Sequence, residues 1–332
     1  MIKIAVLGAG TMGTVHADAY STMKDVKIAA IVDIRKEVGE SLAKKHETIF
    51  YSSFDRMLKE LKPDVIDICL PTYLHRDYVE KAAKAKKHII CEKPIARTLE
   101  QAREIIEITS REGVKLFIAQ VVRFFPEFKK ARELVTSGAI GDVCTVRTMR
   151  GGIFPQAWED WYASYEKSGT LVVDMIIHDF DYMLWCFGDV ERVYAKSQLG
   201  REMNRMDHAL VSLRFRNGII AHTEGTWAYP DGFLVELEIA GKDGIIHFKS
   251  DETMPIKSSK RNMQGGSGGV AVPESPLEKN PYQLELEHFI DCIVNDKPPI
   301  VTPEDGYKAL EVSLAALESI QTGKPVTLGG GK

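Results

Sequence analysis

Cysteine is scarce in this sequence, and the usual metal-binding patterns are missing. The five cysteines among 332 residues stand apart from one another, without a C-x-x-C pair. A disulfide framework, a structural zinc site and a dithiol redox motif are therefore not expected. The sequence also lacks an H-E-x-x-H motif, and it has no close His/Cys/Asp cluster beyond one pair discussed below. We expect no bound metal.

Long apolar runs and an excess of positive charge are also missing. No apolar run reaches the roughly 20 residues that span a membrane, and the formal net charge is -4. The N-terminus enters a strand-like pattern without a basic segment and a cleavable apolar stretch. Hydrophobic content of 44% and charged content of 27% are typical of a globular protein. We expect a cytoplasmic protein that binds neither nucleic acid nor membrane.

The first third of the chain alternates short apolar runs with amphipathic segments. Helices are predicted near residues 11–23, 36–45 and 73–84, and another ends at Gly113, a typical helix C-cap. Strands rich in Val and Ile, separated by helices, predict a parallel sheet covered on both faces. The predicted strands are residues 2–8, 26–33, 64–71, 87–94 and 114–120.

The pattern changes after about residue 123. A helix near residues 126–136 and a final helix at residues 303–322 flank strand-like runs separated by glycine-containing turns, and residues 263–276 are predicted as a loop. The predicted fold class is α/β, with a doubly wound parallel sheet in residues 1–122. Residues 123–332 are predicted as an α+β domain on a large, mostly antiparallel open sheet. The C-terminal helix would pack back on the first domain.

The first predicted strand runs into a glycine-rich turn that opens a helix. Gly8, Gly10 and Gly13 form a G-x-G-x-x-G pattern in the sequence GAGTMG. The first glycine permits a tight turn, the second lets a pyrophosphate approach the backbone, and the third lets the helix pack closely. Free N–H groups at the helix N-terminus favour an anion. Strand, glycines and helix together predict a Rossmann-type dinucleotide site.

An acidic residue ends the second predicted strand. Asp33 lies about twenty residues beyond the glycines, where a carboxylate can bind the adenosine ribose hydroxyls. A carboxylate there repels a 2′-phosphate, so NAD is favoured as the cofactor. Arg35 could instead meet a 2′-phosphate, so NADP stays possible.

One apolar stretch carries an unexpected acid and imidazole. In TLVVDMIIHDFDYMLWCFG, residues 170–188, Asp174 and His178 would lie one turn apart on the same face of a helix. They could be a buried structural pair in which Asp174 accepts a hydrogen bond from His178. Burying such groups costs about 2–7 kcal/mol unless they are paired, so a catalytic role is favoured. Histidine suits proton transfer because its pKa lies near working pH.

The chain resembles the family of glucose–fructose oxidoreductase, inositol dehydrogenase and rhizopine-catabolism oxidoreductases (Gfo/Idh/MocA). The resemblance rests on GAGTMG, PTYLH at residues 71–75, CEKP at residues 91–94, SGTLVVDMIIHDFD, and the ending from NPYQLELEHF to EDGYKAL. It implies NAD(P)-dependent oxidation of a secondary hydroxyl of a sugar, inositol or related polyol. It also implies a homodimer or homotetramer formed through the C-terminal sheet.

The resemblance implies roles for individual residues. Lys93, Asp174 and His178 would form the catalytic trio, and Lys93 would stabilise a developing alkoxide. Relatives often carry Asn before the Arg-Phe pair, where this chain has Val121, so Gln120 would replace it. The expected cofactor-binding residues are Gly8, Ala9, Gly10, Thr11, Met12, Gly13, Asp33, Ile34, Arg35, Leu70, Pro71, Thr72, His75, Glu92 and Lys93. The expected substrate-binding residues are Lys93, Gln120, Arg123, Trp161, Asp174 and His178.

Other interpretations stay open at this point. The turn-rich segment from Arg150 to Tyr162, which includes Trp161, could bind a polyol or could be a packed loop or a subunit contact. The same catalytic parts could run a transient oxidation with a retained cofactor, in a glycosidase-like or sugar–sugar oxidoreductase. A dinucleotide-sensing regulator without catalysis is a further alternative, although the intact catalytic trio argues against it.

Overall fold

The computed structural model describes residues 1–199, 206–251, 256–260 and 280–329. The predicted loop at residues 263–276 lies outside these ranges. The chain divides into two compact units: Met1–Phe124 with Lys279–Tyr307, and Phe125–Glu278 with Lys308–Lys332. The first unit therefore contains a segment from near the C-terminus as well as the predicted N-terminal domain.

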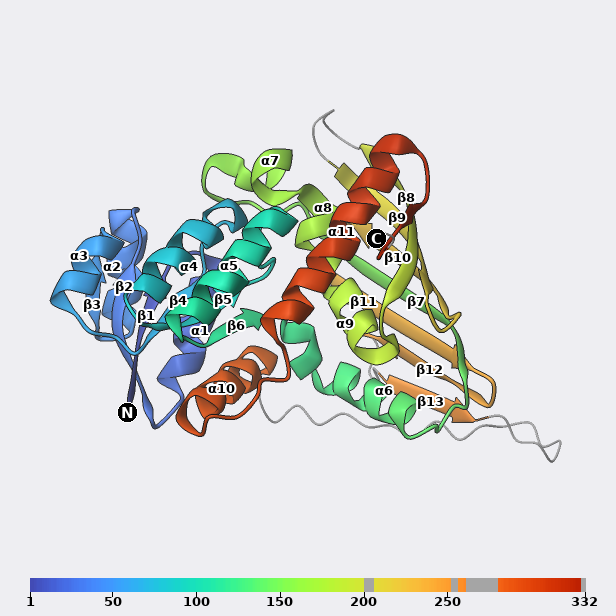
Figure 1. Cartoon of the computed structure of the whole chain (residues 1–332), viewed down its shortest axis with the longest axis horizontal. Helices are drawn as coiled ribbons and strands as arrows, with labels where there is room; N and C mark the ends of the chain where they lie inside the picture. Colours follow the sequence, from blue (N-terminus) through green and yellow to red (C-terminus); the bar gives the residue numbers. More distant parts are fainter. Residues whose placement is uncertain (200–205, 252–255, 261–279, 330–332) are drawn as a thin grey trace. The chain divides into compact units, whose positions relative to one another are not determined.

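The first unit is built on a six-stranded sheet whose pairs are all parallel (Figure 1). The strand order is β3-β2-β1-β4-β5-β6, the doubly wound order of dinucleotide-binding folds. The strands are β1 Ile2–Leu7, β2 Val26–Val32, β3 Ile49–Tyr51, β4 Val65–Ile68, β5 His88–Glu92 and β6 Leu116–Ala119. All residues of β4 and β6 are buried, as expected for strands covered on both faces. The predicted Rossmann sheet is confirmed.

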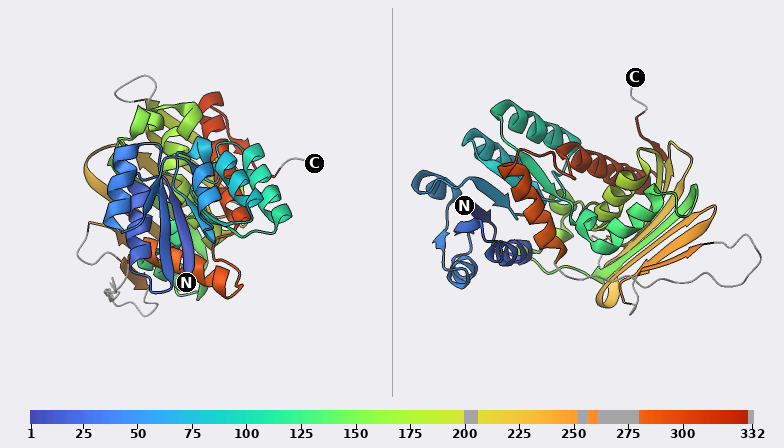
Figure 2. Two further views of the ribbon diagram at one scale, coloured as in Figure 1. Left: turned by 90° about the vertical axis from the view of Figure 1, so that its left-hand side faces the viewer. Right: turned by 90° about the horizontal axis from the view of Figure 1, so that it is seen from below.

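Helices cover both faces of this sheet. In Figure 2, α1 and α10 lie on one side of the strands, and α4 and α5 lie on the other. Their bounds, with those of the shorter helices, are α1 Thr11–Ser21, α2 Lys36–Lys45, α3 Phe54–Glu60, η1 Thr72–Leu74, α4 His75–Lys84, α5 Leu99–Glu112, η2 Val121–Phe124 and α10 Pro281–Val294. At α5, Thr98 accepts a hydrogen bond from the N–H of Gln101, and Gly113 ends the helix at φ 67°. The C-cap expected at Gly113 is therefore present.

The returning segment adds a helix to the first unit. Phe289 of α10 stacks on Phe117 of β6, with ring centroids 5.0 Å apart, and meets Phe124 edge-on at 6.0 Å. Leu286 and Phe289 are fully buried. The segment that joins α10 to α11 is bonded to the same unit, because Arg123 donates a 2.9 Å hydrogen bond to the carbonyl of Ile300.

The second unit is built on an eight-stranded sheet in the order β13-β12-β11-β7-β10-β9-β8-β14. The pair β7–β10 is parallel and the other pairs are antiparallel, so the sheet is mixed but mostly antiparallel, as predicted. The strands are β7 Val143–Ile153, β8 Val190–Leu199, β9 Met206–Phe215, β10 Ile220–Thr226, β11 Ala228–Gly241, β12 Gly244–Lys249, β13 Ile256–Lys260 and β14 Val326–Thr327.

The described helices of the second unit lie over one face of its sheet (Figures 1 and 2). They are α6 Pro126–Thr136, η3 Trp158–Ala163, α7 Tyr165–Ser168, α8 Thr170–Asp174 and α9 Ile177–Phe187, together with α11 Pro303–Thr322 from Lys308 onward. Side chains alternate along β10, where Ala221 and Thr223 are buried while Ile220 and His222 are exposed. One face of the sheet therefore carries the core of this unit, and the other presents side chains outward.

Among the residues that the structure describes, no helix combines the length and the apolar character needed to cross a membrane. The five cysteines, all of them within the described ranges, are free thiols.

Candidate functional site

The glycine turn of the first unit leaves the N-terminus of α1 open. Gly8 has a φ of 101°, and a Cβ there would overlap the carbonyl oxygen of Cys69. A Cβ on Gly13 would overlap the carbonyl oxygen of Gly8, so α1 packs directly on the turn. Gly10 is the N-cap residue and supplies no capping side chain. The N–H groups of the first helical turn, which begins at Thr11, are therefore available to an anion.

Asp33 follows β2 and faces the same turn. Its Oδ2 accepts a 2.7 Å hydrogen bond from the N–H of Ala9, so the carboxylate is fixed against the glycine loop. The Arg35 guanidinium contacts both oxygens, with Nε–Oδ1 at 3.0 Å and Nη2–Oδ2 at 2.7 Å. Burial alone would raise the pKa of Asp33, but the bonds from Arg35 and Ala9 lower it. The carboxylate is therefore ionised at neutral pH. Ile34, between the two, is exposed.

The other predicted residues of the first unit lie where the parallel strands end. Leu70, Pro71 and Thr72 follow β4, whereas Glu92 ends β5 and is followed by half-buried Lys93. Because β4 pairs with β5, and β5 with β6, these ends lie along one edge of the sheet. In open α/β sheets, ligands bind outside the carboxyl ends of the strands.

His75 holds two of these strand-end segments together. Its Nδ1 lies 2.8 Å from the carbonyl oxygen of Pro94, and its Nε2 lies 2.8 Å from the carbonyl oxygen of Leu70. Burial lowers the pKa of His75, although both carbonyl contacts act in the opposite direction. The imidazole therefore fixes the backbone on which cofactor-binding residues were predicted.

Gln120 and Arg123, both predicted as substrate-binding residues, differ in their surroundings. Gln120 follows β6 and is fully buried, and neither Oε1 nor Nε2 has a hydrogen-bond partner among the described residues. Arg123 is equally buried, but its Nη1 donates to the carbonyl of Ile300 and lies 3.2 Å from Oδ2 of Asp305. The Arg123 guanidinium therefore ties η2 to the segment before α11. The buried amide of Gln120 instead calls for a polar group from outside the described chain.

The acid and the imidazole of the second unit do not lie on one continuous helix. Helix α8 ends at Asp174 and α9 begins at Ile177. The N–H of Ile176 bonds back to the carbonyl of Leu171 at 3.1 Å, and the N–H of His178 approaches the carbonyl of Met175 at 3.4 Å. The expectation of an unbroken helix over residues 170–188 is therefore wrong. Two pairs of β-branched residues, Val172–Val173 and Ile176–Ile177, lie on either side of the break, and such residues have a lower helix propensity.

The second unit contains a buried ion pair next to His178 that the sequence did not reveal. Arg150 of β7 binds Asp179 in a bidentate manner, with Nε–Oδ2 at 2.9 Å and Nη2–Oδ1 at 3.1 Å. Both side chains are almost fully buried. The Arg150 guanidinium, considered above as a polyol ligand, thus anchors the first turn of α9. The local sequence around Arg150 and Asp179 contains other charged and polar residues and does not indicate that these two side chains pair.

Trp161 belongs to an aromatic group within the second unit. Its ring stacks on Tyr162 with centroids 3.9 Å apart, and Tyr162 meets Trp227 edge-on at 6.4 Å. Trp161 is only partly buried, so part of its indole surface is open to a ligand. Asp174 and His178 are also partly buried.

These features define a dinucleotide-binding protein. A glycine turn opens the first helix of a Rossmann sheet, an ionised carboxylate follows the second strand, and a buried unpaired amide lies at the ligand-binding edge. This arrangement fits a nicotinamide dinucleotide at the carboxyl edge.

Comparison with known proteins agrees with this class. Residues 2–120 match the model of the oxidoreductase family with an NAD-binding Rossmann fold (GFO_IDH_MocA), and residues 132–328 match the model of its C-terminal alpha/beta domain. The chain belongs to this family of oxidoreductases, and its N-terminal unit is the NAD-binding domain.

Relatives of similar length support the same assignment. The uncharacterized oxidoreductase YrbE of Bacillus subtilis (strain 168) is 30% identical, over 98% of this chain and 96% of its own. Myo-inositol 2-dehydrogenase of Thermotoga maritima is 30% identical, over 98% of both chains. The crystal structure of a probable dehydrogenase from Thermotoga maritima, 29% identical, superposes with a TM-score of 0.82 over 98% of this chain and 99% of its own.

Proposed function

We propose that this oxidoreductase reversibly oxidises a secondary hydroxyl of a sugar, inositol or related polyol to a ketone. The observation that carries the proposal is the edge of the first sheet. There the open glycine turn follows β1, and Lys93 and the unpaired amide of Gln120 follow β5 and β6, two neighbouring strands of the same parallel sheet. A polyol offers several hydroxyl groups that can satisfy a buried amide. The printed name of the myo-inositol 2-dehydrogenase relative points to the same substrate class.

The chemistry divides between proton transfer and positioning. The nicotinamide, when bound, accepts a hydride at C4. His178 is the proposed general base, which takes the hydroxyl proton during oxidation and returns it during reduction. Lys93 donates a hydrogen bond to the reacting oxygen and stabilises its negative charge. Asp174 orients the substrate or the imidazole. The buried Arg150–Asp179 pair fixes the helical turn that carries His178.

NAD is the proposed cofactor in preference to NADP. The Asp33 carboxylate is fixed against the glycine loop and would repel a 2′-phosphate. Arg35, the nearby cation that could bind such a phosphate, is already engaged by both carboxylate oxygens of Asp33. Binding of NADP would require this ion pair to open.

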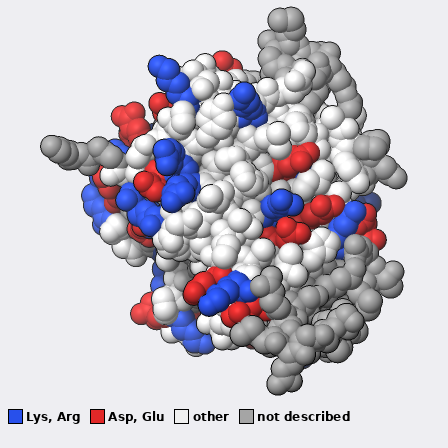
Figure 3. Space-filling view, turned by 90° about the vertical axis from the view of Figure 1, so that its right-hand side faces the viewer, with Lys and Arg blue, Asp and Glu red and all other residues white. Residues whose placement is uncertain are grey.

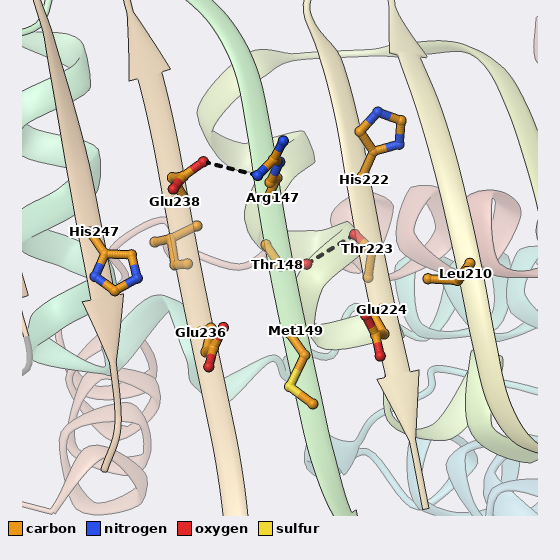
Figure 4. Close-up of a pocket in the computed structure, with 11 residues that line it drawn as sticks. Arg147, Thr148, Met149, Leu210, His222, Thr223, Glu224, Glu236, Glu238 and His247 are labelled. Atoms are coloured by element: carbon orange, nitrogen blue, oxygen red, sulfur yellow. Dashed lines mark hydrogen bonds and ion pairs between the residues drawn. The ribbon is translucent and has the colours of Figure 1, made fainter. Parts of the chain in front are cut away.

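We further propose that the outward face of the second sheet joins copies of this chain into a homodimer or homotetramer. Figure 3 shows this face, on which acidic and basic side chains lie together in small groups surrounded by uncharged surface. Leu210 and Ile220 are 52% and 38% exposed on neighbouring strands. Figure 4 shows a hollow on the sheet in which Arg147 of β7 faces Glu238 of β11 at 3.8 Å. Apolar side chains interspersed with both charges suit a self-complementary interface. Free thiols and an NAD cofactor suit an enzyme of the cytoplasm.

The test is a panel of inositols and aldoses with NAD or NADP, followed by the absorbance of the reduced nicotinamide. Lys93→Ala and His178→Ala are each expected to lower turnover at least about a hundredfold, the lower end for loss of acid–base assistance. Lys87→Ala, which changes a lysine just before the opposite end of β5, is the matched control and should keep normal turnover. Near-normal turnover in both active-site variants would contradict the assigned roles.

Two other outcomes identify the alternatives. Conversion of a sugar without net release of NADH would indicate a transient oxidation with a retained cofactor. A protein that binds NAD, turns over no polyol and keeps its partner binding after Lys93→Ala would be a regulator.

A further inference from the structure

A fully buried histidine lies behind the strand ends of the first unit, between two carboxylates. His16 projects from α1, and its Nδ1 lies 2.9 Å from Oδ2 of Asp67 in β4. On the other side of the ring, Nε2 lies 3.2 Å from Oε1 of Glu92, the last residue of β5. The contact with Asp67 is a hydrogen bond. The contact with Glu92 is an ion pair that does not have the geometry of a hydrogen bond. An imidazole with carboxylate oxygens on both sides is most stable when both nitrogens carry protons.

The surroundings keep His16 charged. Burial alone would lower its pKa, but Asp67 and Cys69 raise it well above the ordinary value. His16 is therefore an imidazolium at neutral pH. The titratable groups that face His16 or its helix come from α1 itself and from elements packed around it. They are Tyr20 of α1, Asp67 of β4, Cys69 just after β4, Glu92 of β5 and Glu285 of α10.

The Glu92 carboxylate connects His16 to Lys93, the proposed catalytic lysine. Oε2 of Glu92, the oxygen that does not face His16, accepts a 3.0 Å hydrogen bond from the backbone N–H of Lys93. The Glu92 carboxylate thus bridges a buried cation and the peptide group of Lys93. That peptide group sets the direction in which the Lys93 side chain leaves the strand.

We propose that His16 is a positioning residue, which holds the Glu92 carboxylate against the Lys93 amide and so fixes the lysine for catalysis. This inference rests on the proposed function only in the role that it gives to Lys93. The links from His16 to Glu92 and from Glu92 to Lys93 stand on the geometry of the first unit alone.

The same cluster could be considered as a metal site, because ligand atoms of His16, Asp67 and Cys69 lie within 4.8 Å of one another. A metal requires a thiolate and an imidazole nitrogen without its proton. Burial raises the pKa of the Cys69 thiol, and the pKa of His16 is also raised. Both groups therefore hold their protons, which favours the hydrogen-bonded imidazolium.

Two isosteric variants separate the two sides of the imidazole. The amide nitrogen of asparagine takes the place of Nδ1, so His16→Asn keeps the bond to Asp67 and loses the contact with Glu92. The amide nitrogen of glutamine takes the place of Nε2, so His16→Gln keeps a donor beside Glu92 and loses the bond to Asp67. Both variants remove the charge.

We expect His16→Asn to lower kcat at least about tenfold, with little change in the KM for the polyol or the Kd for NADH. The decrease in kcat should be clearly smaller for His16→Gln. In a Glu92→Met background, which removes both side-chain oxygens, the difference between the two variants should disappear, because the contact with residue 92 that distinguishes them is gone. His46 is a histidine outside the proposed site, with a side chain only 5% exposed and Nε2 3.0 Å from Oδ1 of Asp18. Its Asn and Gln variants are matched controls, and both should keep normal kcat.

A readout that needs no turnover is the amide proton of Lys93 in NMR spectra. We expect it to move upfield in His16→Asn and to stay near its wild-type position in His16→Gln. If the wild type turns over no polyol, the proposed function fails, while this measurement still tests the link from His16 to Lys93. The proposal would be overturned if the Lys93 amide proton shifted equally in His16→Asn and His16→Gln. It would also be overturned if both variants lost kcat equally, in proportion to their loss in Tm. Stoichiometric binding of Zn²⁺ with loss of the imidazolium signal would also overturn it.

Discussion

Gly10 offers a test of the cofactor site that separates binding from folding. Its φ of -78° and ψ of -164° are open to any residue. The nearest atom to an added Cβ is Nη2 of Arg35, at 3.9 Å, so Gly10→Ala should fit the free protein without displacement. Gly13→Ala is the contrasting change, because its Cβ would overlap the backbone oxygen of Gly8.

The two substitutions should therefore differ in their effects. For Gly10→Ala, the loss of chain freedom in the unfolded state stabilises by about 0.4–1 kcal/mol, and the poorer N-cap offsets part of that. Its Tm should stay within about 4 °C of the wild type. Gly13→Ala forces overpacking against backbone and should destabilise by about 1–3 kcal/mol or more.

Gly10→Ala should weaken the binding of NAD although it leaves the stability of the free protein nearly unchanged. A methyl group on Gly10 would stand where we expect the pyrophosphate of NAD to approach the N–H groups of α1. Loss of one hydrogen bond to a charged group costs about 1.5–3 kcal/mol, so the Kd for NAD should rise at least about tenfold. Calorimetric titration measures the Kd, and thermal unfolding with and without NAD reports stability and protection. A Gly10→Ala protein that binds NAD as tightly as the wild type would refute the placement of the pyrophosphate.

Three further outcomes are expected. Asp33→Ser removes the carboxylate and releases Arg35, so the ratio of kcat/KM for NADP to that for NAD should rise at least about tenfold; an unchanged ratio in initial-rate assays would contradict the assigned cofactor preference. Arg150→Met leaves the Asp179 carboxylate buried without its partner, and urea unfolding should show a loss of about 3–5 kcal/mol, much of it recovered by adding Asp179→Leu. Leu210→Glu should dissociate the oligomer in sedimentation experiments, and an unchanged mass would exclude this sheet face as the interface.

The regular part of the fold was predictable because its signals are local. Short runs of β-branched residues separated by amphipathic helices indicated the parallel sheet, and Gly113 marked the end of α5 at the correct residue. The strand β3, Ile49–Tyr51, and the helix α3, Phe54–Glu60, were missed. A strand of three residues is too short to show a period, and both elements depend on packing against β2.

The site was less predictable, because its residues are defined by distant partners. Histidine at position 75 and arginine at position 123 have the chemistry of ligand-binding groups. The structure shows that they are bonded to the backbone oxygens of Leu70, Pro94 and Ile300. Nothing in the local sequence distinguishes such an anchor from a ligand-binding group. The break between α8 and α9 was also hidden, because the apolar pattern continues through it.

The late return of α10 has a consequence for the order in which this protein can form. Phe117 of β6 has its stacking partner, Phe289, near the end of the chain. The first 124 residues leave the ribosome long before Phe289 is synthesised. The nascent chain therefore keeps the apolar surface that α10 later covers exposed throughout most of translation. A gene fragment cut after the sixth strand would make a protein with that same surface permanently exposed to solvent.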